Sequence, residues 1–441
     1  MKNSHYTPGI VAEAMARHIP AVARTILEPA VGDGRLLQPL AELPRRRRMR
    51  LVCLDIDPTA TKTVRKEYKK PFGDQLQVIT EDFLSWKPGA ALREWLPVDC
   101  VLMNPPFSAQ KANWLHTPTE WDKEFKLLHS KIPIEIAFFI QACRFVRPEG
   151  KIITVAPESM VSALSTSWFR QFLLMEGSVE QVYELRRFSF SSIESRFFIL
   201  VFSRSVHRKS TLLVNNELTN PKFLSMGDMS SLLPIRFDFG FHEASIQLKE
   251  IRSKTPNLDW RSLNSLADIV RGKVSAPFSK RKIPVHSNNF EEGSWVVDKR
   301  RKPHKDRQIL PAVSTGDLLL KRVGRGCLQS CGPYSGPDGL LVSDCVLRMR
   351  PKKHVSRIKL ILALRVLLGT ESVRRLLERG TGAAFVTEMD LSDLLVPIDI
   401  DLLLPDIYSR YETAIRKKDS GTMHVIEEKY RDSLISHLQS R

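Results

Sequence analysis

The tetrapeptide Asn104-Pro105-Pro106-Phe107 combines residue types that can hold a planar amine. Proline fixes φ and has no N–H group, so the carbonyl oxygens around the two prolines can accept hydrogen bonds from a ligand. The side-chain oxygen of Asn104 is a second acceptor, and the ring of Phe107 could stack on the base that carries the amine, a contact worth about 1–3 kcal/mol. A turn closed by two prolines is the alternative interpretation of the tetrapeptide alone.

Four apolar runs, the last of which leads into Asn104, predict strands that end in polar or glycine-rich segments. The runs are residues 25–27, followed by the loop 28–34; residues 51–54, followed by Asp55; residues 76–80, followed by Glu81-Asp82-Phe83; and residues 98–103. Ligands in open α/β sheets bind outside the carboxyl ends of the strands. We therefore expect these four segments to converge on one crevice.

The loop Glu28-Pro29-Ala30-Val31-Gly32-Asp33-Gly34 lies between the first strand and the helix-like segment 35–40. Its glycines allow the backbone to approach a ligand closely, and the helix N-terminus that follows favours an anionic group. Asp55 follows at roughly the twenty-residue spacing at which a carboxylate meets a ribose hydroxyl, whereas Asp57 is expected to cap the next helix. The fingerprint Gly-x-Gly-x-x-Gly is not completed, which argues against a pyrophosphate-containing dinucleotide.

In their order, these segments resemble the gamma-class N6-adenine DNA methyltransferases. Two departures from the family pattern are Val31 and Asp33, where small residues are common, and Phe107, where many members have Tyr. Neither removes a group that the chemistry requires. The matching segments are Tyr6-Thr7-Pro8, Glu28 to Gly34, Leu54 to Pro58, Glu81-Asp82-Phe83, Asn104 to Phe107, and residues 145–157, 181–185 and 197–202.

The resemblance implies a fold of the α/β class, with a Rossmann-like class I methyltransferase sheet and helices on both faces. It covers roughly the first half of the chain, and the polar, turn-rich stretch Ser205–Pro234 suggests a boundary after it. Five later segments, residues 266–273, 314–324, 341–351, 380–387 and 391–397, are similar to target-recognition domains of gamma-class enzymes and of type I specificity subunits. We therefore expect a methyltransferase domain at 1–235, a mixed α+β DNA target-recognition domain at 236–400 and a helical tail at 401–441.

The resemblance implies S-adenosylmethionine as the cofactor, and no metal. Thr7 would contact its methionine end, Asp55 its ribose and Asp82 its adenine amine, with Phe83 against the ring. The alternatives are that Thr7-Pro8 is a helix cap, that Asp82 caps a strand end, and that Phe83 is part of the core. The implied cofactor-binding residues are Tyr6, Thr7, Glu28, Ala30, Gly32, Gly34, Asp55, Ile56, Asp82, Phe83 and Asn104.

The implied reaction is direct displacement of the methyl group by N6 of an adenine that has been flipped out of double-stranded DNA. Accepting the amine hydrogens at Asn104 and at the carbonyl of Pro105 would favour the pyramidal nitrogen that forms during attack. Phe188 or Phe190 could face the flipped base opposite Phe107, or both rings could belong to the core. Asn104, Pro105, Pro106 and Phe107 are the implied catalytic residues. Methylation of cytosine N4, an RNA base or a protein glutamine is an alternative, and a non-catalytic DNA-binding protein is another.

The net charge of +18 at pH 7 over 441 residues favours a polyanionic partner, which we expect to be DNA. The run Arg45–Arg48 is expected to be a solvated face away from the strand ends. Residues 111–131, with Trp114, His116 and Trp121, could close over DNA or act as packing anchors. Basic residues of the second half could contact phosphates or read guanine edges, and spacing does not separate these roles. They are Lys273, Lys280, Arg281, Lys282, Lys299, Arg300, Arg301, Lys302, Lys305 and Arg307.

The chain has no apolar stretch long enough for a membrane span and no leader, so we expect a cytoplasmic protein without membrane contact. Six cysteines without CxxC pairs favour free thiols over a zinc site. Because the chain begins near Tyr6, we expect no N-terminal nuclease. Cleavage would then belong to a separate restriction endonuclease or defence-system subunit, unless the enzyme is an orphan. Two tail helices, at 407–416 and 422–438, could pack within the chain, which we favour for a monomer, or form a dimer.

Overall fold

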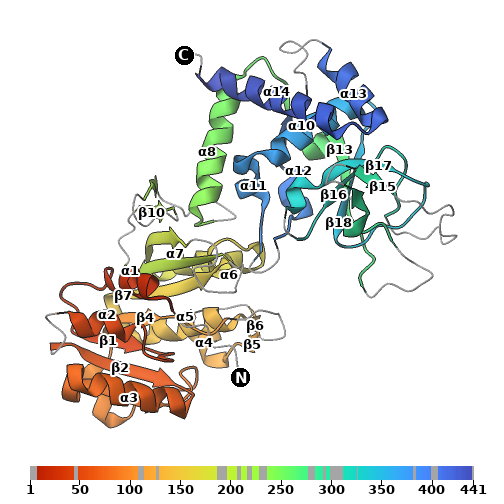
Figure 1. The fold of residues 1–441 in the computed structure, drawn as a ribbon. Coiled ribbons are helices and arrows are strands. Elements are labelled where there is room, and N and C mark those ends of the chain that lie inside the picture. The colour runs from red at the N-terminus through yellow and green to blue at the C-terminus, as the bar shows by residue number, and fades with distance from the viewer. Residues whose placement is uncertain are drawn as a thin grey trace. The chain divides into compact units, whose positions relative to one another are not determined.

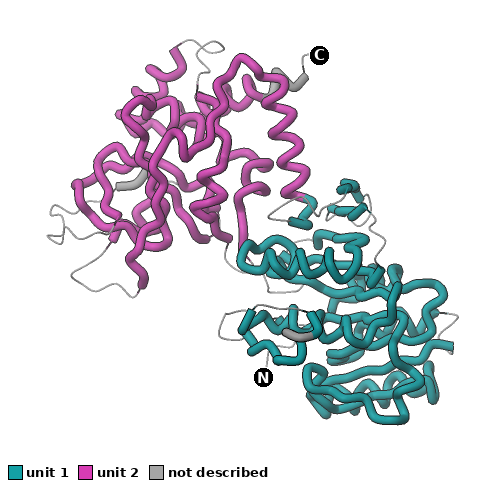
Figure 2. The backbone as a smooth tube through the Cα atoms, turned by 180° about the vertical axis from the view of Figure 1, so that it is seen from behind, with its two compact units in different colours: residues 1–239 teal, residues 240–441 magenta. Residues whose placement is uncertain are grey.

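The computed structural model divides into two compact units, residues 1–239 and 240–441 (Figure 2). It describes residues 7–43, 48–107, 114–125, 129–185, 196–205, 210–215, 221–227, 236–276, 284–291, 295–297, 311–324, 326–380, 384–398 and 406–439. Among these residues, no helix is long and apolar enough to cross a membrane.

The first unit is built on a nine-stranded mixed sheet with the strand order β11-β10-β8-β9-β7-β4-β1-β2-β3. From β7 to β3 in this order, neighbouring strands are parallel. Strand β9 is antiparallel to both of its neighbours, β7 and β8. The strands are β1 (Thr25–Glu28), β2 (Arg50–Asp55), β3 (Leu76–Thr80), β4 (Val98–Met103), β7 (Val146–Pro157), β8 (Ser178–Glu184), β9 (Phe197–Ser203), β10 (Thr211–Val214) and β11 (Phe223–Met226). A separate pair is formed by β5 (Leu115–His116) and β6 (Lys131–Ile132).

Helices cover both faces of this sheet (Figure 1). Successive residues of each strand point to opposite faces, so a strand that is apolar throughout must be covered on both sides. In β1, Ile26 packs in one core cluster with α1 (Gly9–Ala16), α2 (Leu37–Glu42) and α3 (Pro58–Phe72). Leu27 packs in the other, with α5 (Ile134–Phe145) and α7 (Ser167–Glu176). The expected α/β sheet with two helical layers is therefore confirmed. The remaining helices are α4 (Thr119–Phe125) and α6 (Glu158–Val161).

The second unit contains a six-stranded sheet of order β13-β18-β16-β17-β15-β14 and the short pair β12-β19. The strands are β12 (Trp260–Ser262), β13 (Ala267–Arg271), β14 (Phe290–Glu291), β15 (Trp295–Val297), β16 (Leu318–Lys321), β17 (Cys331–Ser335), β18 (Val346–Pro351) and β19 (Leu395–Pro397). The helices are α8 (Phe239–Lys254), α9 (Leu263–Leu266), α10 (Arg357–Gly369), α11 (Glu371–Leu377), α12 (Glu388–Ser392), α13 (Ile407–Lys417) and α14 (Ser420–Gln439). This is the mixed α+β composition that the sequence predicts.

The two tail helices pack within the second unit. Tyr411 of α13 and Tyr430 of α14 are fully buried in the same core cluster as α10. Glu427 of α14 forms a buried ion pair with Arg365 of α10 at 2.5 Å and accepts a hydrogen bond from the Tyr411 hydroxyl. These contacts favour the intrachain alternative for the tail.

The segment between residues 205 and 234 is more regular than the sequence suggests. Instead of only a polar boundary, it contributes β10, parallel to β8, and β11, antiparallel to β10, which extend the first sheet. Both strands are short and flanked by polar residues, so neither has an alternation long enough to be recognised.

Candidate active site

The polar segments that follow β1, β2 and β4 lie at one edge of the first sheet. β1 is parallel to β2 on one side and to β4 on the other, so its neighbours' carboxyl ends flank its own. The strand order reverses here, since β2 and β3 extend the sheet in one direction and β4 and β7 in the other. A crevice forms at such a switch point in open α/β sheets. The topology therefore brings together the segments that the sequence predicts to converge.

The loop 28–34 is tied to the end of β2 by a hydrogen bond from Gly32 N to Asp55 Oδ2 of 2.8 Å. Gly32 and Gly34 have φ of +52° and +80°, a region that favours glycine. A Cβ on Gly34 would lie 2.6 Å from the Tyr68 ring, so a larger residue does not fit there. A Cβ on Gly32 would meet no described atom within 4 Å. The backbone at Gly32 thus faces open space at the sheet edge.

Glu28, the last residue of β1, is a buried carboxyl group with 2 % exposure. Burial, followed by the charges of Asp55 and Asp33, raises the pKa of Glu28 well above its usual value of 4.5. Its Oε2 atom is buried and has no hydrogen-bond partner among the described residues. A cation placed beside this oxygen would offset the cost of ionising the group. This corner of the edge is therefore suited to a positively charged ligand.

Asp55 ends β2 with both carboxylate oxygens bound to backbone N–H groups, Oδ2 to Gly32 and Oδ1 to Asp57 at 2.9 Å. Each oxygen has a further lone pair, so the group can accept additional hydrogen bonds from hydroxyls. Asp57 caps α3 by accepting a hydrogen bond from Thr59 N at 2.8 Å, which confirms the expected cap. Between them, Ile56 is 69 % exposed and offers an apolar surface beside the carboxylate.

Asp82 and Phe83, after β3, have different surroundings. Asp82 is exposed, and its Oδ1 accepts a hydrogen bond from Leu84 N at 3.0 Å. Phe83 is 1 % exposed and packs against Phe138 and Phe145, with ring centroids 5.4 and 5.8 Å away. This placement favours the core alternative for Phe83, because the ring has almost no surface left for a ligand. The Asp82 carboxylate remains accessible.

Asn104 follows β4 directly, and its side chain is fixed by a contact with Thr7. Asn104 Nδ2 donates a hydrogen bond of 2.9 Å to Thr7 Oγ1, and Thr7 is itself 4 % exposed. The side-chain carbonyl Oδ1 lies on the other side of the amide from this bond. Thr7 does not serve as the cap of α1, because Pro8 is the N-cap and no side chain caps the helix. This contact was not predicted from the sequence, because it joins residues 97 positions apart in the chain.

The rest of the tetrapeptide is partly buried. Pro105 is buried, Pro106 is exposed, and Phe107 is half-buried with its ring 5.1 Å from that of Phe197 at the start of β9. This contact fixes the ring against the sheet and leaves part of it accessible.

A buried ion network lies where β8 ends and β9 begins, and it includes two residues that precede α8. Arg196 Nη2 contacts Glu184 Oε1 at 3.0 Å and Asp238 Oδ2 at 3.2 Å, and Asp238 is also paired with Arg236 at 2.6 Å. Burial lowers the pKa of Arg196, but the charges of Glu184 and Asp238 outweigh it, so the pKa is raised. The sequence analysis did not single out these four charged residues.

Several predicted residues lie outside the described part of the chain: Tyr6, Arg45, Arg46, Arg47, Lys111, Phe188, Phe190, Lys280, Arg281, Lys282, Lys299, Arg300, Arg301, Lys302, Lys305 and Arg307. Lys273 and Arg48 are described and exposed. Trp121 is 2 % exposed and lies in the core, which favours a packing role, and His116 is exposed.

Residues 2–226, just over half of the chain, match the family model for N-6 DNA methylases. Three solved structures are similar in fold. A protein of Listeria monocytogenes, described as a class I S-adenosylmethionine-dependent methyltransferase, has 20 % identity and a TM-score of 0.40, with 50 % of this chain and 69 % of that chain covered. The type IIG restriction endonuclease BpuSI has 12 % identity and a TM-score of 0.48, with 100 % and 67 % covered. The methyltransferase subunit of a type I restriction-modification system of Streptococcus thermophilus has 19 % identity and a TM-score of 0.41, with 48 % and 47 % covered, about half of its length. With TM-scores this low, the family assignment rests on the family model alone.

Proposed function

Because the chain belongs to the N-6 DNA methylase family, we propose that it transfers a methyl group from S-adenosylmethionine to N6 of an adenine in double-stranded DNA. The observation that carries this proposal is the Asn104 carboxamide, which Thr7 holds by its nitrogen at the end of β4. With the nitrogen bound to Thr7, the carboxamide presents its oxygen as an acceptor. An acceptor held beside two prolines is the group that an exocyclic amine needs.

The residues at the sheet edge fit the groups of the proposed cofactor. Glu28, with a buried Oε2 and a raised pKa, suits the ammonium of the methionine end. Asp55 has lone pairs left for the ribose hydroxyls, and Asp82 has an accessible carboxylate for the adenine amine. When bound, the cofactor supplies an electrophilic methyl group. Ile56, Thr7, Ala30, Gly32 and Gly34 complete the proposed set, together with Tyr6.

The chain's own residues hold and orient the amine. Asn104 Oδ1 and the Pro105 carbonyl accept its two hydrogens, which localises the nitrogen lone pair for attack. Because these acceptors are preorganised by the Thr7 contact and by the prolines, they favour the transition state more than the planar ground state. Phe107 stacks on the flipped base, and Pro106 restricts the backbone between Phe107 and the amine-binding carbonyl. Phe188 or Phe190 is the proposed partner on the other face of the base.

Double-stranded DNA is the proposed partner, attracted by the net charge of +18 and by basic residues of the second unit, such as Lys273, Lys280, Arg281 and Arg300. We place the reaction in the cytoplasm, in a restriction–modification or related defence system or as an orphan activity. A separate restriction endonuclease or defence-system subunit is the protein partner that the first two roles require.

The test is transfer of labelled methyl groups to duplex DNA by the purified protein and by Asn104→Ala. We expect transfer by the wild type and its loss in the variant, while the variant binds S-adenosylmethionine as the wild type does. Ser85→Ala, an exposed position after β3, is a matched control and should keep full activity.

Undiminished transfer by Asn104→Ala would overturn the role of the carboxamide. Cofactor binding without methylation of any nucleic acid would support a DNA-binding protein with a vestigial cofactor pocket. Transfer to cytosine or to RNA would keep the chemistry and change the substrate.

A further inference from the structure

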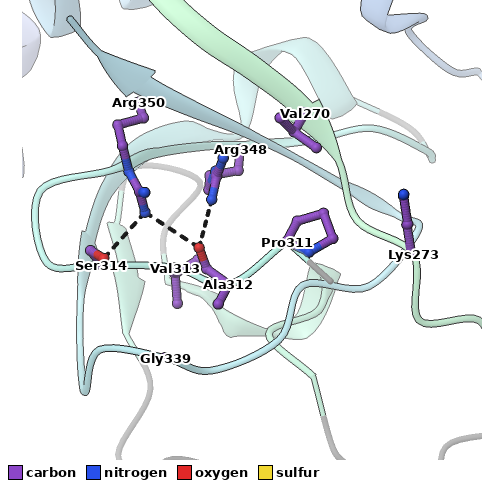
Figure 3. A pocket seen from close by; sticks show the side chains of 9 residues that line it. All are labelled: Val270, Lys273, Pro311, Ala312, Val313, Ser314, Gly339, Arg348 and Arg350. Atoms are coloured by element: carbon purple, nitrogen blue, oxygen red, sulfur yellow. Dashed lines mark hydrogen bonds between the residues drawn. The ribbon is translucent and has the colours of Figure 1, made fainter. Parts of the chain in front are cut away.

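A basic hollow of about 490 Å³ lies on the second unit, over the face of the sheet opposite to the helical core. It is lined by Val270, Lys273, Pro311, Ala312, Val313, Ser314, Gly339, Arg348 and Arg350 (Figure 3). Its volume lies in the range of roughly 300–1,000 Å³ found for small-ligand pockets. Of these residues, only Lys273 belongs to the basic set that the sequence predicts to contact DNA.

Arg348 and Arg350 project into the hollow from β18, because residues two apart in a strand share a face. Figure 3 shows the two side chains next to each other, with hydrogen bonds converging on Ala312. The intervening Met349 points the other way and is fully buried in the helical core. The strand pattern thus places two guanidinium groups on one wall.

Arg350 is neutralised by Asp317 through a two-pronged contact. Arg350 Nε and Nη2 lie 2.7 and 2.8 Å from the two Asp317 carboxylate oxygens, and Nη2 also contacts Ser314 Oγ at 3.2 Å. The Asp317 hydrogen bond raises the pKa of Arg350. The forked edge of this guanidinium is therefore already used within the protein.

Arg348 has a different environment. Its Nη1 donates a 2.7 Å hydrogen bond to the Ala312 carbonyl, and its Nε is buried with no hydrogen-bond partner among the described residues. Within the described chain it forms no ion pair, and burial followed by the charge of Arg350 lowers its pKa. Arg348 thus keeps a positive charge that is only partly compensated, on a guanidinium whose orientation is fixed.

These contacts separate two roles that an arginine can have on DNA. Reading a guanine requires two donors on one open edge of the guanidinium, to reach O6 and N7 together. In Arg350 the Nε–Nη2 edge is bound to Asp317, and in Arg348 the same edge is closed to a ligand because its Nε is buried, while its Nη1 already donates to Ala312. A phosphate, in contrast, is attracted by a point charge and needs no fork.

Lys273 supplies a second point charge at the rim. It is exposed and forms no ion pair with a described residue. It follows Gly272, where an added Cβ would lie 2.0 Å from the Ser343 carbonyl oxygen. Only glycine allows the chain to pass this close to the neighbouring backbone, so Gly272 sets where Lys273 emerges.

We propose that this hollow is a backbone-phosphate subsite for DNA, in which Arg348 and Lys273 attract the phosphate, Ser314 offers a hydroxyl, and Arg350 with Asp317 forms the supporting wall. The proposal rests on the proposed function, because it takes DNA as the substrate. It assigns these residues to positioning DNA, and it leaves sequence reading to other parts of the unit.

The test measures binding of the full chain to two fluorescent duplexes of unrelated sequence over a series of salt concentrations. Each phosphate contact contributes about 0.9 to the slope of log affinity against log salt. We expect Arg348→Gln and Lys273→Gln each to weaken binding to both duplexes alike and to reduce the slope by about 1. Arg348→Lys should retain most of the slope, since it keeps the charge.

Arg416→Gln is the matched control, because it removes one positive charge from a side chain that is 71 % exposed on α13 and far from β18 in sequence. It should leave the slope nearly unchanged. Thermal unfolding of each variant identifies any loss of fold.

Two results would overturn the subsite. One is an unchanged slope in folded Arg348→Gln and Lys273→Gln, and the other is a loss of affinity for one duplex sequence only, which indicates base reading. Methyl transfer by the wild type is measured separately. If transfer is absent while the slopes change as expected, the proposed function fails and the subsite stands.

Discussion

At Asn104, the hydrogen bond to Thr7 orients the carboxamide and so bears on which atom would meet the proposed substrate amine. Thr7 Oγ1 accepts from Asn104 Nδ2 at 2.9 Å, so the amide is held with its oxygen on the opposite side. An amide in the reverse orientation would present a donor to a donor, and the substrate amine would be repelled. Thr7 is therefore a positioning residue for Asn104 as well as a proposed cofactor contact.

This pairing predicts the effect of Thr7→Val, which keeps the shape and removes the hydroxyl. We expect kcat at saturating cofactor to fall about threefold to tenfold, the equivalent of one hydrogen bond worth about 0.5–1.5 kcal/mol, with KM for DNA little changed. Thr7→Ser should recover most of the activity. Thr63→Val, at a half-buried position of α3 where the hydroxyl donates to the Thr59 carbonyl, is the control. A wild-type kcat in Thr7→Val would contradict this role.

The buried carboxyl group of Glu28 predicts that the stability of the protein depends on pH and that its affinity for the cofactor depends on Glu28. Burial raises its folded-state pKa above the usual 4.5, so the folded protein holds a proton there that the unfolded chain releases. Stability therefore falls as pH rises from 4.5 toward the folded pKa, and Glu28→Gln, which cannot ionise, should escape this fall. At neutral pH we expect the variant to unfold at a higher temperature than the wild type.

The same substitution should weaken binding of S-adenosylmethionine about tenfold to a hundredfold, since a hydrogen bond to a charged group is worth about 1.5–3 kcal/mol. At a pH between 4.5 and the folded-state pKa of Glu28, calorimetry in two buffers of different ionisation enthalpy should also show proton release on binding to the wild type and none in the variant. Equal affinity of the two proteins would remove Glu28 from the proposed cofactor site.

At the level of elements, the loop 28–34 at the end of β1 is the part of the edge that we propose approaches the cofactor with its backbone. Gly34 is required by its contact with Tyr68, whereas a Cβ on Gly32 would extend into open space at a φ of +52°. The two glycines therefore have different roles, one in packing and one in access.

This difference predicts that Gly32→Ala loses cofactor affinity beyond what its stability cost explains. Gly73→Ala is the control, because Gly73 also has a positive φ, +61°, and open space, but it is the C-cap of α3 and lies before β3 begins at Leu76. Gly32→Ala should cost about 1–2 kcal/mol of stability from the positive φ, and Gly73→Ala at least as much, since its ψ of −132° lies in a region that glycine alone adopts readily. Only Gly32→Ala should weaken S-adenosylmethionine binding, by about tenfold or more; equal affinities would show that the loop does not contact the cofactor.

The sequence predicts the elements of the sheet edge well where local pattern and packing agree. The apolar runs that form β1, β2, β3 and β4 each end in a polar or glycine-rich segment, which marks the end of the strand. Asp57 before Pro58 correctly predicted the start of α3. The strands β10 and β11 were not predicted, because four-residue strands at a sheet margin carry too little alternation. The Thr7–Asn104 contact was also out of reach, since it depends on two segments 97 residues apart meeting in the fold.

At the scale of the whole molecule, the chain joins two compact units with different chemistry. The first gathers carboxylates and an amide at the switch point of its sheet, and the second carries a basic hollow on its sheet. Charge composition predicts that DNA is bound, but it does not separate phosphate contacts from base reading. Phosphate contacts and base reading are distinguished by which edges of the Arg348 and Arg350 guanidinium groups are already hydrogen-bonded within the protein. The partners in these hydrogen bonds are distant in sequence, so the sequence does not predict them.

We propose that this protein methylates adenine at N6 and that Asn104 carries the reaction. The most direct measurement is mass spectrometry of nucleosides from duplex DNA after incubation with S-adenosylmethionine and either the wild type or Asn104→Ala. We expect N6-methyladenine with the wild type, none with the variant, and no modified cytosine in either sample. Unmodified DNA from the wild type, N4-methylcytosine in place of N6-methyladenine, or equal methylation by the variant would contradict it.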